Sequence, residues 1–189
     1  MDKAILDTDI LSEVMRGKDA RVVERASAYL QIHECLTISV ITVAEVIKGF
    51  ERLQRESEVA RFMANIRMMD VLSLTVDAAI IAGRIYGTLE RSGLPIGRMD
   101  PLVAAIALNN NLQLVTGNVT HYDRLRPLGF DLRISNWREQ FSQIFQSLTY
   151  WKIFQSLCLL ATTISVASQA KLRPVKTTFP RKDRVPSQP

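Results

Sequence analysis

Two cysteines, Cys35 and Cys158, are all that the 189 residues contain. Because they lie far apart and have no paired spacing, a disulfide framework is not expected, and both are interpreted as thiols in a reducing cytoplasm. A signal peptide is not expected either, since Asp2, Asp7 and Asp9 interrupt any apolar run at the N-terminus. The sequence therefore predicts a cytoplasmic protein of ordinary composition, long enough for one full domain.

A surplus of basic charge is missing from the first 140 residues, although the whole chain has a net charge of +5. Seven of the 24 Lys and Arg residues follow position 140, but only one of the 19 Asp and Glu residues does, which leaves 17 basic and 18 acidic residues before it. The basic character therefore belongs to the tail. It does not indicate that the folded domain binds nucleic acid.

Short apolar runs alternate with helical patterns along the first 140 residues. Strands are expected over 4–6, 36–40, 71–72, 112–115 and 132–134. Helices are expected over 10–16, 20–30, from Thr42 onward, 56–69, 76–91 and 100–108. This alternation predicts an α/β fold of the three-layer type, with a central parallel sheet flanked by helices.

The tail differs in composition from this domain, which is expected to span residues 1–140. Residues 141–170 repeat the pentapeptide Ile-Phe-Gln-Ser-Leu and carry no charge after Lys152. Seven polar residues between 153 and 170 make this segment too polar for a typical membrane span, so an apolar, helical extension without membrane contact is expected. Residues 171–189 combine basic residues with prolines and are expected to be disordered.

Polar side chains follow two of the apolar runs, at the point where each predicted strand ends. Asp7 comes directly after 4–6, and Thr116 comes directly after 112–115. In open parallel sheets, ligands bind outside the carboxyl ends of the strands. Acidic groups placed there commonly hold a hard divalent cation through oxygen ligands. Four short elements are expected to converge on one site: residues 7–9, Glu45, Asp100 and residues 116–118.

Two of these acidic residues also have purely structural explanations. Thr42 and Glu45 have the spacing of a capping box at a helix start. Asp100 precedes Pro101, which suits the first position of a helix, so Asp100 could be a helix N-cap. Local sequence alone leaves the structural and the metal-binding interpretations open.

Four stretches, in this order and spacing, carry a resemblance to a known family: 5–12 (ILDTDILS), 38–46 (ISVITVAEV), 94–105 (LPIGRMDPLVAA) and 114–118 (LVTGN). They resemble the PIN-domain ribonucleases, and among these the VapC-type toxins of bacterial toxin–antitoxin pairs. The resemblance extends to about Trp137 and does not include the tail.

The resemblance implies a metal-dependent endoribonuclease that cuts RNA such as tRNA, forms a homodimer and is neutralised by a small cognate antitoxin. Asp7, Glu45 and Asp100 would bind Mg²⁺ or Mn²⁺. Asn118 stands where many relatives have a fourth acidic residue, and it would add a neutral oxygen to the catalytic set without adding charge. Three neighbouring residues would support this set: Thr8, Asp9 and Thr116.

Phosphodiester hydrolysis explains why such a site needs carboxylates. A divalent cation lowers the pKa of bound water and stabilises charge on the attacking and leaving oxygens. Without the cation, three like charges within several ångströms would repel one another and raise their own pKa values. RNA phosphates would also be repelled by the carboxylates, so basic residues are expected around the rim. The candidate RNA contacts are Arg84, Arg91, Arg98 and His121.

Two other functions fit parts of the pattern. A non-catalytic PIN-fold module that partners a DNA-binding antitoxin would need the fold but not the acidic set, which is intact here. A phosphatase of the haloacid dehalogenase type also has Asp-x-Asp after its first strand, as in 7–9. However, Ile10 and Leu11 follow the pair and no Gly-Asp segment occurs later, so the chain departs from the phosphatase pattern.

Overall fold

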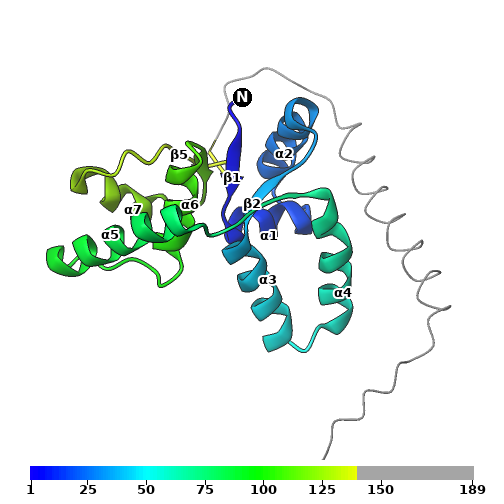
Figure 1. Cartoon of the computed structure of the whole chain (residues 1–189). Coiled ribbons are helices and arrows are strands. Elements are labelled where there is room, and N and C mark those ends of the chain that lie inside the picture. Colours follow the sequence, from blue (N-terminus) through cyan, green and yellow to red (C-terminus); the bar gives the residue numbers. More distant parts are fainter. Residues whose placement is uncertain (140–189) are drawn as a thin grey trace, which may run out of the picture.

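The computed structural model describes residues 1–139, so the expectations for 141–170 and 171–189 lie outside the described part of the chain. Strands alternate with helices as the sequence predicts (Figure 1). The strands are β1 (Ala4–Leu6), β2 (Thr37–Ser39), β3 (Asp70–Leu72), β4 (Gln113–Val115) and β5 (Ile134–Ser135). The helices are α1 (Thr8–Arg16), α2 (Ala20–His33), α3 (Val40–Arg52), α4 (Glu56–Asn65), α5 (Val76–Ser92), α6 (Asp100–Asn109) and α7 (Val119–Tyr122), with 3₁₀ turns at Ile66–Met68 and Asp123–Leu128.

The five strands form one sheet in the order β3-β2-β1-β4-β5, and every neighbouring pair is parallel. Ile5 is paired with Thr37 on one side and with Leu114 on the other, so β1 is the central strand. The predicted parallel α/β architecture is confirmed. Because the chain builds β2 and β3 on one side of β1 and returns to build β4 on the other, the order reverses between β1 and β4, which is where such sheets bind ligands.

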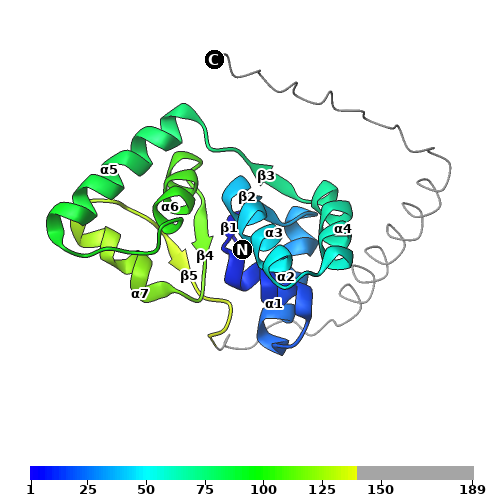
Figure 2. The same ribbon diagram turned by 90° about the horizontal axis from the view of Figure 1, so that it is seen from below.

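Successive residues of the central strand face opposite sides of the sheet, and each side has its own apolar core. Ala4 and Leu6 belong to the core beneath α1, α2, α3 and α4. Ile5 belongs to the core beneath α5, α6 and α7. Figures 1 and 2 show this division, with the blue and cyan helices on one side of β1 and the green helices on the other. The sheet is thus covered by helices on both faces.

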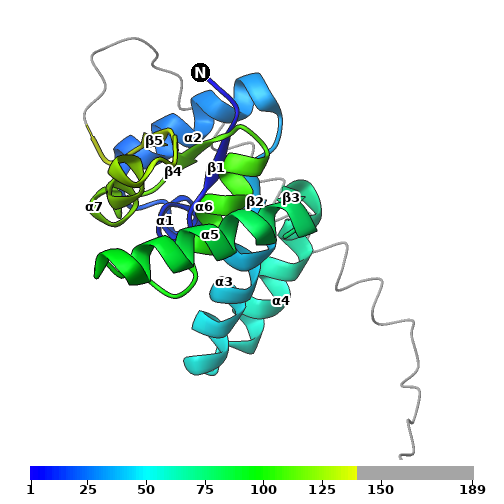
Figure 3. The same cartoon turned by 60° about the vertical axis from the view of Figure 1, so that its left-hand side comes forward.

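Helices α3 and α4 form an antiparallel pair that projects from the sheet (Figure 3). Phe50 of α3 and Phe62 of α4 pack edge to face with ring centroids 6.5 Å apart. The pair leaves a hollow against α1.

Two predicted helix caps and one predicted strand differ from the structure. Strand β2 ends at Ser39, and Ser39 rather than Thr42 caps α3, because its side chain accepts the Thr42 N–H at 3.0 Å. Glu45 therefore lies outside any capping box. Helix α6 begins at Asp100 as expected, but its N-cap is Met99, and the Asp100 carboxylate accepts the Gly97 N–H instead of capping the helix. The last strand is Ile134–Ser135, shifted toward the C-terminus from the predicted 132–134.

Within residues 1–139, no helix is both long enough and apolar enough to cross a membrane.

Candidate active site

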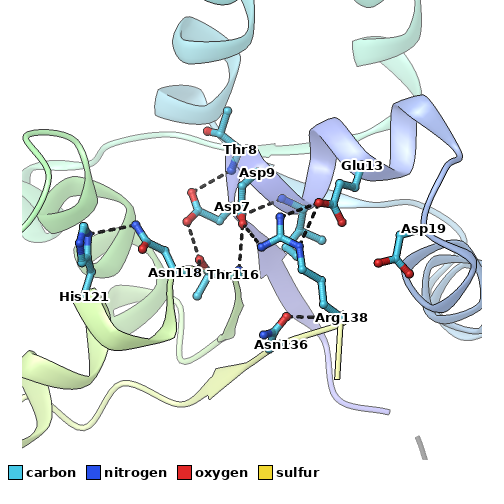
Figure 4. Close-up of polar contacts among 12 residues, drawn as sticks. Asp7, Thr8, Asp9, Glu13, Asp19, Thr116, Asn118, His121, Asn136 and Arg138 are labelled. Atoms are coloured by element: carbon cyan, nitrogen blue, oxygen red, sulfur yellow. Dashed lines mark hydrogen bonds and ion pairs between the residues drawn. The ribbon is translucent and has the colours of Figure 1, made fainter. Parts of the chain in front are cut away.

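Asp7 and Thr116 meet at the point where the strand order reverses. The Asp7 N–H donates to Val115 O at 2.9 Å, which extends the β1–β4 ladder by one residue and brings Thr116 beside Asp7. Thr116 Oγ1 then donates to Asp7 Oδ2 at 2.8 Å (Figure 4). The two residues predicted from the ends of apolar runs are therefore in direct contact.

The Asp7 carboxylate is buried, with only 8% of the residue exposed. Its Oδ1 accepts from Thr8 N at 2.8 Å, and its Oδ2 accepts from Tyr122 Oη at 3.3 Å as well as from Thr116. Burial raises the pKa of Asp7 from 3.8 to about 6; the hydrogen bonds from Thr116 and Thr8 lower it in part, and the charges of Asp9 and Asp100 raise it further. Burial and the nearby Asp7 charge also raise the pKa of Tyr122. A positive ion beside Asp7 would relieve this cost.

A cleft of about 480 Å³ opens above Asp7 at the carboxyl ends of the strands. Glu45, in the second turn of α3, reaches the cleft and accepts from Thr8 Oγ1 at 2.6 Å. The cleft thus brings together side chains from five segments: Asp7, Thr8, Asp9, Ser12, Glu45, Lys48, Gly49, Arg52, Asp100, Gly117, Asn118 and Arg138.

Asp100 is held in the cleft by the turn that precedes it. The Gly97 N–H donates to Asp100 Oδ2 at 3.1 Å, and a Cβ on residue 97 would lie 2.8 Å from that oxygen. Only glycine permits so close an approach without displacing the carboxylate. The glycine of the Ile-Gly-Arg-Met-Asp stretch is therefore part of how the acidic residue is positioned.

Asn118 and His121 lie beside Asp100. Asn118 Nδ2 is 3.0 Å from His121 Nδ1, and the same histidine nitrogen is 3.3 Å from Asp100 Oδ2. The Asn118 N–H donates to Thr116 Oγ1 at 2.9 Å, which fixes the turn after β4. Asn118 lines the cleft as expected, whereas His121 does not line it and contacts Asn118 and Asp100.

The donor set fits a hard divalent cation, because Asp7, Glu45, Asp100 and Asn118 all offer oxygen atoms to one cleft. Burial raises the pKa of Asp7, and a cation beside this carboxylate would lower that pKa again. The side chains of residues 1–139 do not, however, gather three acidic, histidine or cysteine groups closely enough to form a ready-made metal cluster.

The basic residues that line the cleft differ from those predicted. Arg84, Arg91 and Arg98 do not line it, and their role as RNA contacts stays a prediction. Arg138 lines it, and so does the pair Lys48 and Arg52. Both lie on α3 at three and seven residues after Glu45, which is the spacing of one helix face. That spacing could have identified them from the sequence.

The fold and the cleft define a class of protein: a parallel α/β domain that presents carboxylates at its topological switch point. Comparison with known proteins specifies the family. The model of the PIN domain matches residues 4–124. The tRNA(fMet)-specific endonuclease VapC of Shigella flexneri is 33% identical over 138 residues, which are 72% of this chain and 99% of the relative.

Solved structures agree with the sequence matches. The structure of VapBC-1 from nontypeable Haemophilus influenzae is similar with a TM-score of 0.62 and 31% identity, covering 72% of this chain and 98% of that one. DNA-bound VapBC from Salmonella typhimurium has the same TM-score and identity and is covered to 99%. The chain therefore belongs to the PIN-domain family and, within it, to the VapC-type ribonucleases. This membership argues against the phosphatase alternative.

Proposed function

We propose that the protein is an endoribonuclease toxin that cuts structured RNA, with tRNA as the substrate class. The observation that carries the proposal is the convergence of Asp7, Glu45, Asp100 and Asn118 on one cleft at the switch point of the sheet. The name of the Shigella relative, a tRNA-specific endonuclease, supports the choice of substrate class. An activity on tRNA would act in the cytoplasm, so this location is part of the proposal.

In the proposed mechanism, Asp7, Glu45 and Asp100 would hold Mg²⁺ or Mn²⁺, and Asn118 would offer a neutral oxygen. The cation, when bound, supplies an activated water and stabilises charge on the phosphate oxygens. The protein's own part is positioning: Thr116 and Thr8 orient the Asp7 carboxylate, and the Gly97 N–H orients Asp100. Lys48 and Arg52 are exposed on the α3 side of the cleft and would bind flanking phosphates.

Expression in bacteria tests this function. The full chain should arrest growth and fragment the tRNA pool, whereas Asp100→Asn should lower cleavage by roughly 100-fold or more, because loss of an indirect support of a metal site already costs 10- to 100-fold. Asp131→Asn is the matched control, since Asp131 is exposed and precedes β5, away from the carboxyl ends of the strands. Northern blots of tRNA report the result. Equal fragmentation by the wild-type and Asp100→Asn proteins would remove the proposal.

We infer further that the cognate antitoxin occupies the hollow of about 750 Å³ between α1, α3 and α4. Its lining includes the half-buried or exposed apolar side chains Met15, Phe50 and Leu53, together with the basic residues Arg55 and Arg61. Five residues line both this hollow and the acidic cleft, so a helix in the hollow could extend a basic side chain toward the carboxylates. They are Thr8, Ser12, Glu45, Gly49 and Arg52.

Leu53 offers a test of this surface that does not disturb the cleft. It lines the hollow, is 54% exposed and does not line the cleft. Leu53→Asp should weaken binding of the small protein encoded beside this gene by about tenfold or more, the value of one buried leucine contact, and should leave RNA cleavage unchanged. Ile32→Asp, at a similarly exposed leucine-sized residue of α2, is the control. Titration calorimetry measures both, and equal affinities for the two variants would refute this docking surface.

The expected homodimer is also part of the proposal. Helix α5 exposes Val76 and Ile80, which lie one turn apart and are 77% and 52% exposed. Such an apolar stripe is a suitable surface for a second copy of the chain, and sedimentation velocity measures the oligomeric state directly.

A further inference from the structure

Arg138 brings a cation into the acidic cleft from the far end of the domain. It follows β5, and its side chain reaches back to α1 (Figure 4). Nη1 lies 2.9 Å from Asp9 Oδ2, while Nε and Nη2 donate to Glu13 Oε1 at 3.0 and 2.8 Å. The Arg138 N–H also donates to Asn136 Oδ1 at 3.0 Å, which fixes the backbone from which the side chain projects. The guanidinium is therefore held in one orientation.

Gly117 makes room for this guanidinium. A Cβ on residue 117 would lie 1.4 Å from Arg138 Nη1 and 2.5 Å from Asp9 Oδ2. The Gly117 N–H donates to the same Asp9 oxygen at 3.0 Å, so Asp9 holds the turn and the arginine together. Any side chain at 117 would displace the arginine. The turn after β4 thus leaves space for the Arg138 side chain, and its Gly117 N–H also binds the Asp9 carboxylate.

The guanidinium has hydrogen-bond capacity left for a ligand. It carries five N–H groups, and its contacts within residues 1–139 use three of them, one to Asp9 and two to Glu13. The side chain is 31% exposed and lines the same cleft as Asp7 and Asp100. A planar fork with free N–H groups suits the oxygens of a phosphate.

We propose that Arg138 binds a phosphate of the RNA substrate beside the acidic cleft, an inference that rests on the proposed ribonuclease function. Asp9 and Glu13 fix the guanidinium before RNA arrives, so little side-chain entropy is lost on binding. Lys48 and Arg52 on α3 line the same cleft as Arg138. The RNA backbone is then contacted both from α3 and from the segment that follows β5.

The alternative role for Arg138 is purely structural: its ion pairs with Asp9 and Glu13 would act as a clasp that links the segment after β5 to α1. Such a clasp would contribute to the free energy of unfolding but not to the affinity for RNA. A phosphate contact contributes to the affinity and to its salt dependence, because each lost contact lowers the slope of log K against log salt by about 0.7 to 0.9. The two roles are therefore distinguished by the salt dependence of binding.

The test uses the full chain, a fluorescently labelled tRNA transcript, EDTA to prevent metal-dependent cleavage, and anisotropy from 50 to 200 mM KCl. Arg138→Gln should lower the affinity about tenfold at 100 mM KCl and reduce the salt slope by about one phosphate contact. Arg21→Gln is the matched control, since Arg21 is also paired with an aspartate, Asp19, but lies on α2 outside the cleft. Residues 140–189 are the same in every variant and so cancel in the comparison.

An unchanged affinity and slope for Arg138→Gln, with or without a lower melting temperature, would reduce Arg138 to a clasp and overturn the inference. If Arg138→Gln does not fold, Arg138→Lys replaces it. Lysine keeps the charge but lacks the planar set of N–H groups, so this variant should retain the salt slope and lose affinity several-fold. Wild-type affinity for Arg138→Lys would also overturn the inference. Failure of the wild-type chain to bind tRNA would count against both this inference and the proposed function. Binding by the wild-type chain with no effect of Arg138→Gln would refute this inference alone.

Discussion

Asp7→Asn is expected to abolish RNA cleavage and, in metal-free buffer at pH 7.5, to increase the free energy of unfolding by up to about 3 kcal/mol. The rise of the Asp7 pKa from 3.8 to about 6 corresponds to about 3 kcal/mol of cost for keeping this buried carboxylate ionised. Asparagine removes the charge, still accepts the Thr8 N–H, and allows the hydroxyls of Thr116 and Tyr122 to turn and accept from its amide. Urea unfolding followed by circular dichroism measures the change.

The contribution of Asp7 to the free energy of unfolding depends on pH, because its pKa differs between the folded and the unfolded chain. Below pH 3.8 the Asp7 carboxyl is protonated in both states and contributes no difference. Between pH 3.8 and about 6 the unfolded chain releases its proton while the folded chain retains it, so the free energy of unfolding falls as pH rises. Above pH 6 the whole cost applies. The advantage of Asp7→Asn should therefore be absent near pH 4 and complete by pH 7. A variant that is less stable at every pH would mean that Asp7 acts mainly as the N-cap of α1.

Trp137→Ala is expected to lower the free energy of unfolding by about 3 to 5 kcal/mol, the usual cost of deleting a large buried aromatic side chain. Trp137 is 1% exposed, and its ring centroid lies 5.8 Å from that of Tyr29. Tyr29 Oη in turn bonds to the backbone of Ala4 at the start of the central strand. The residue therefore joins the end of the domain to α2 and β1.

The same contact predicts where the domain ends. A chain truncated after Glu139 should fold cooperatively, while one truncated after residue 124, the end of the PIN-domain match, should not, because it lacks both β5 and Trp137. Trp137→Phe, which keeps a ring in the core, should lose much less stability than Trp137→Ala. Equal urea midpoints for the wild-type and Trp137→Ala proteins would contradict this assignment of the core.

Much of this arrangement could be predicted because short apolar runs followed directly by a polar residue identify strand ends. Asp7 and Thr116 were located in this way, and the parallel sheet brings them together. The start of α3 was misplaced because Ser39 and Thr42 are both good caps, and only the end of β2 at Ser39 decides between them. Tertiary packing, which local sequence does not record, fixed that boundary.

Arg138 could not have been predicted from spacing. Its partners Asp9 and Glu13 are more than 120 residues away in the sequence, and the close approach to Gly117 depends on the β4–β5 pairing. Lys48 and Arg52 are different, since their helical spacing from Glu45 was visible in the sequence. What separates the two cases is whether a contact lies within one helix or across the sheet.

The most direct test of the metal-dependent cleft is cleavage of total RNA by the purified chain. Wild-type protein and Asp7→Asn would each be incubated with Mg²⁺, with Mn²⁺ and with EDTA, and the new RNA ends would be mapped by sequencing. We expect a small set of discrete cuts from the wild-type protein with either metal, and none from Asp7→Asn or in EDTA. The same cuts from both proteins, or cuts that persist in EDTA, would contradict the assignment of Asp7 and its neighbours to a metal-dependent active site.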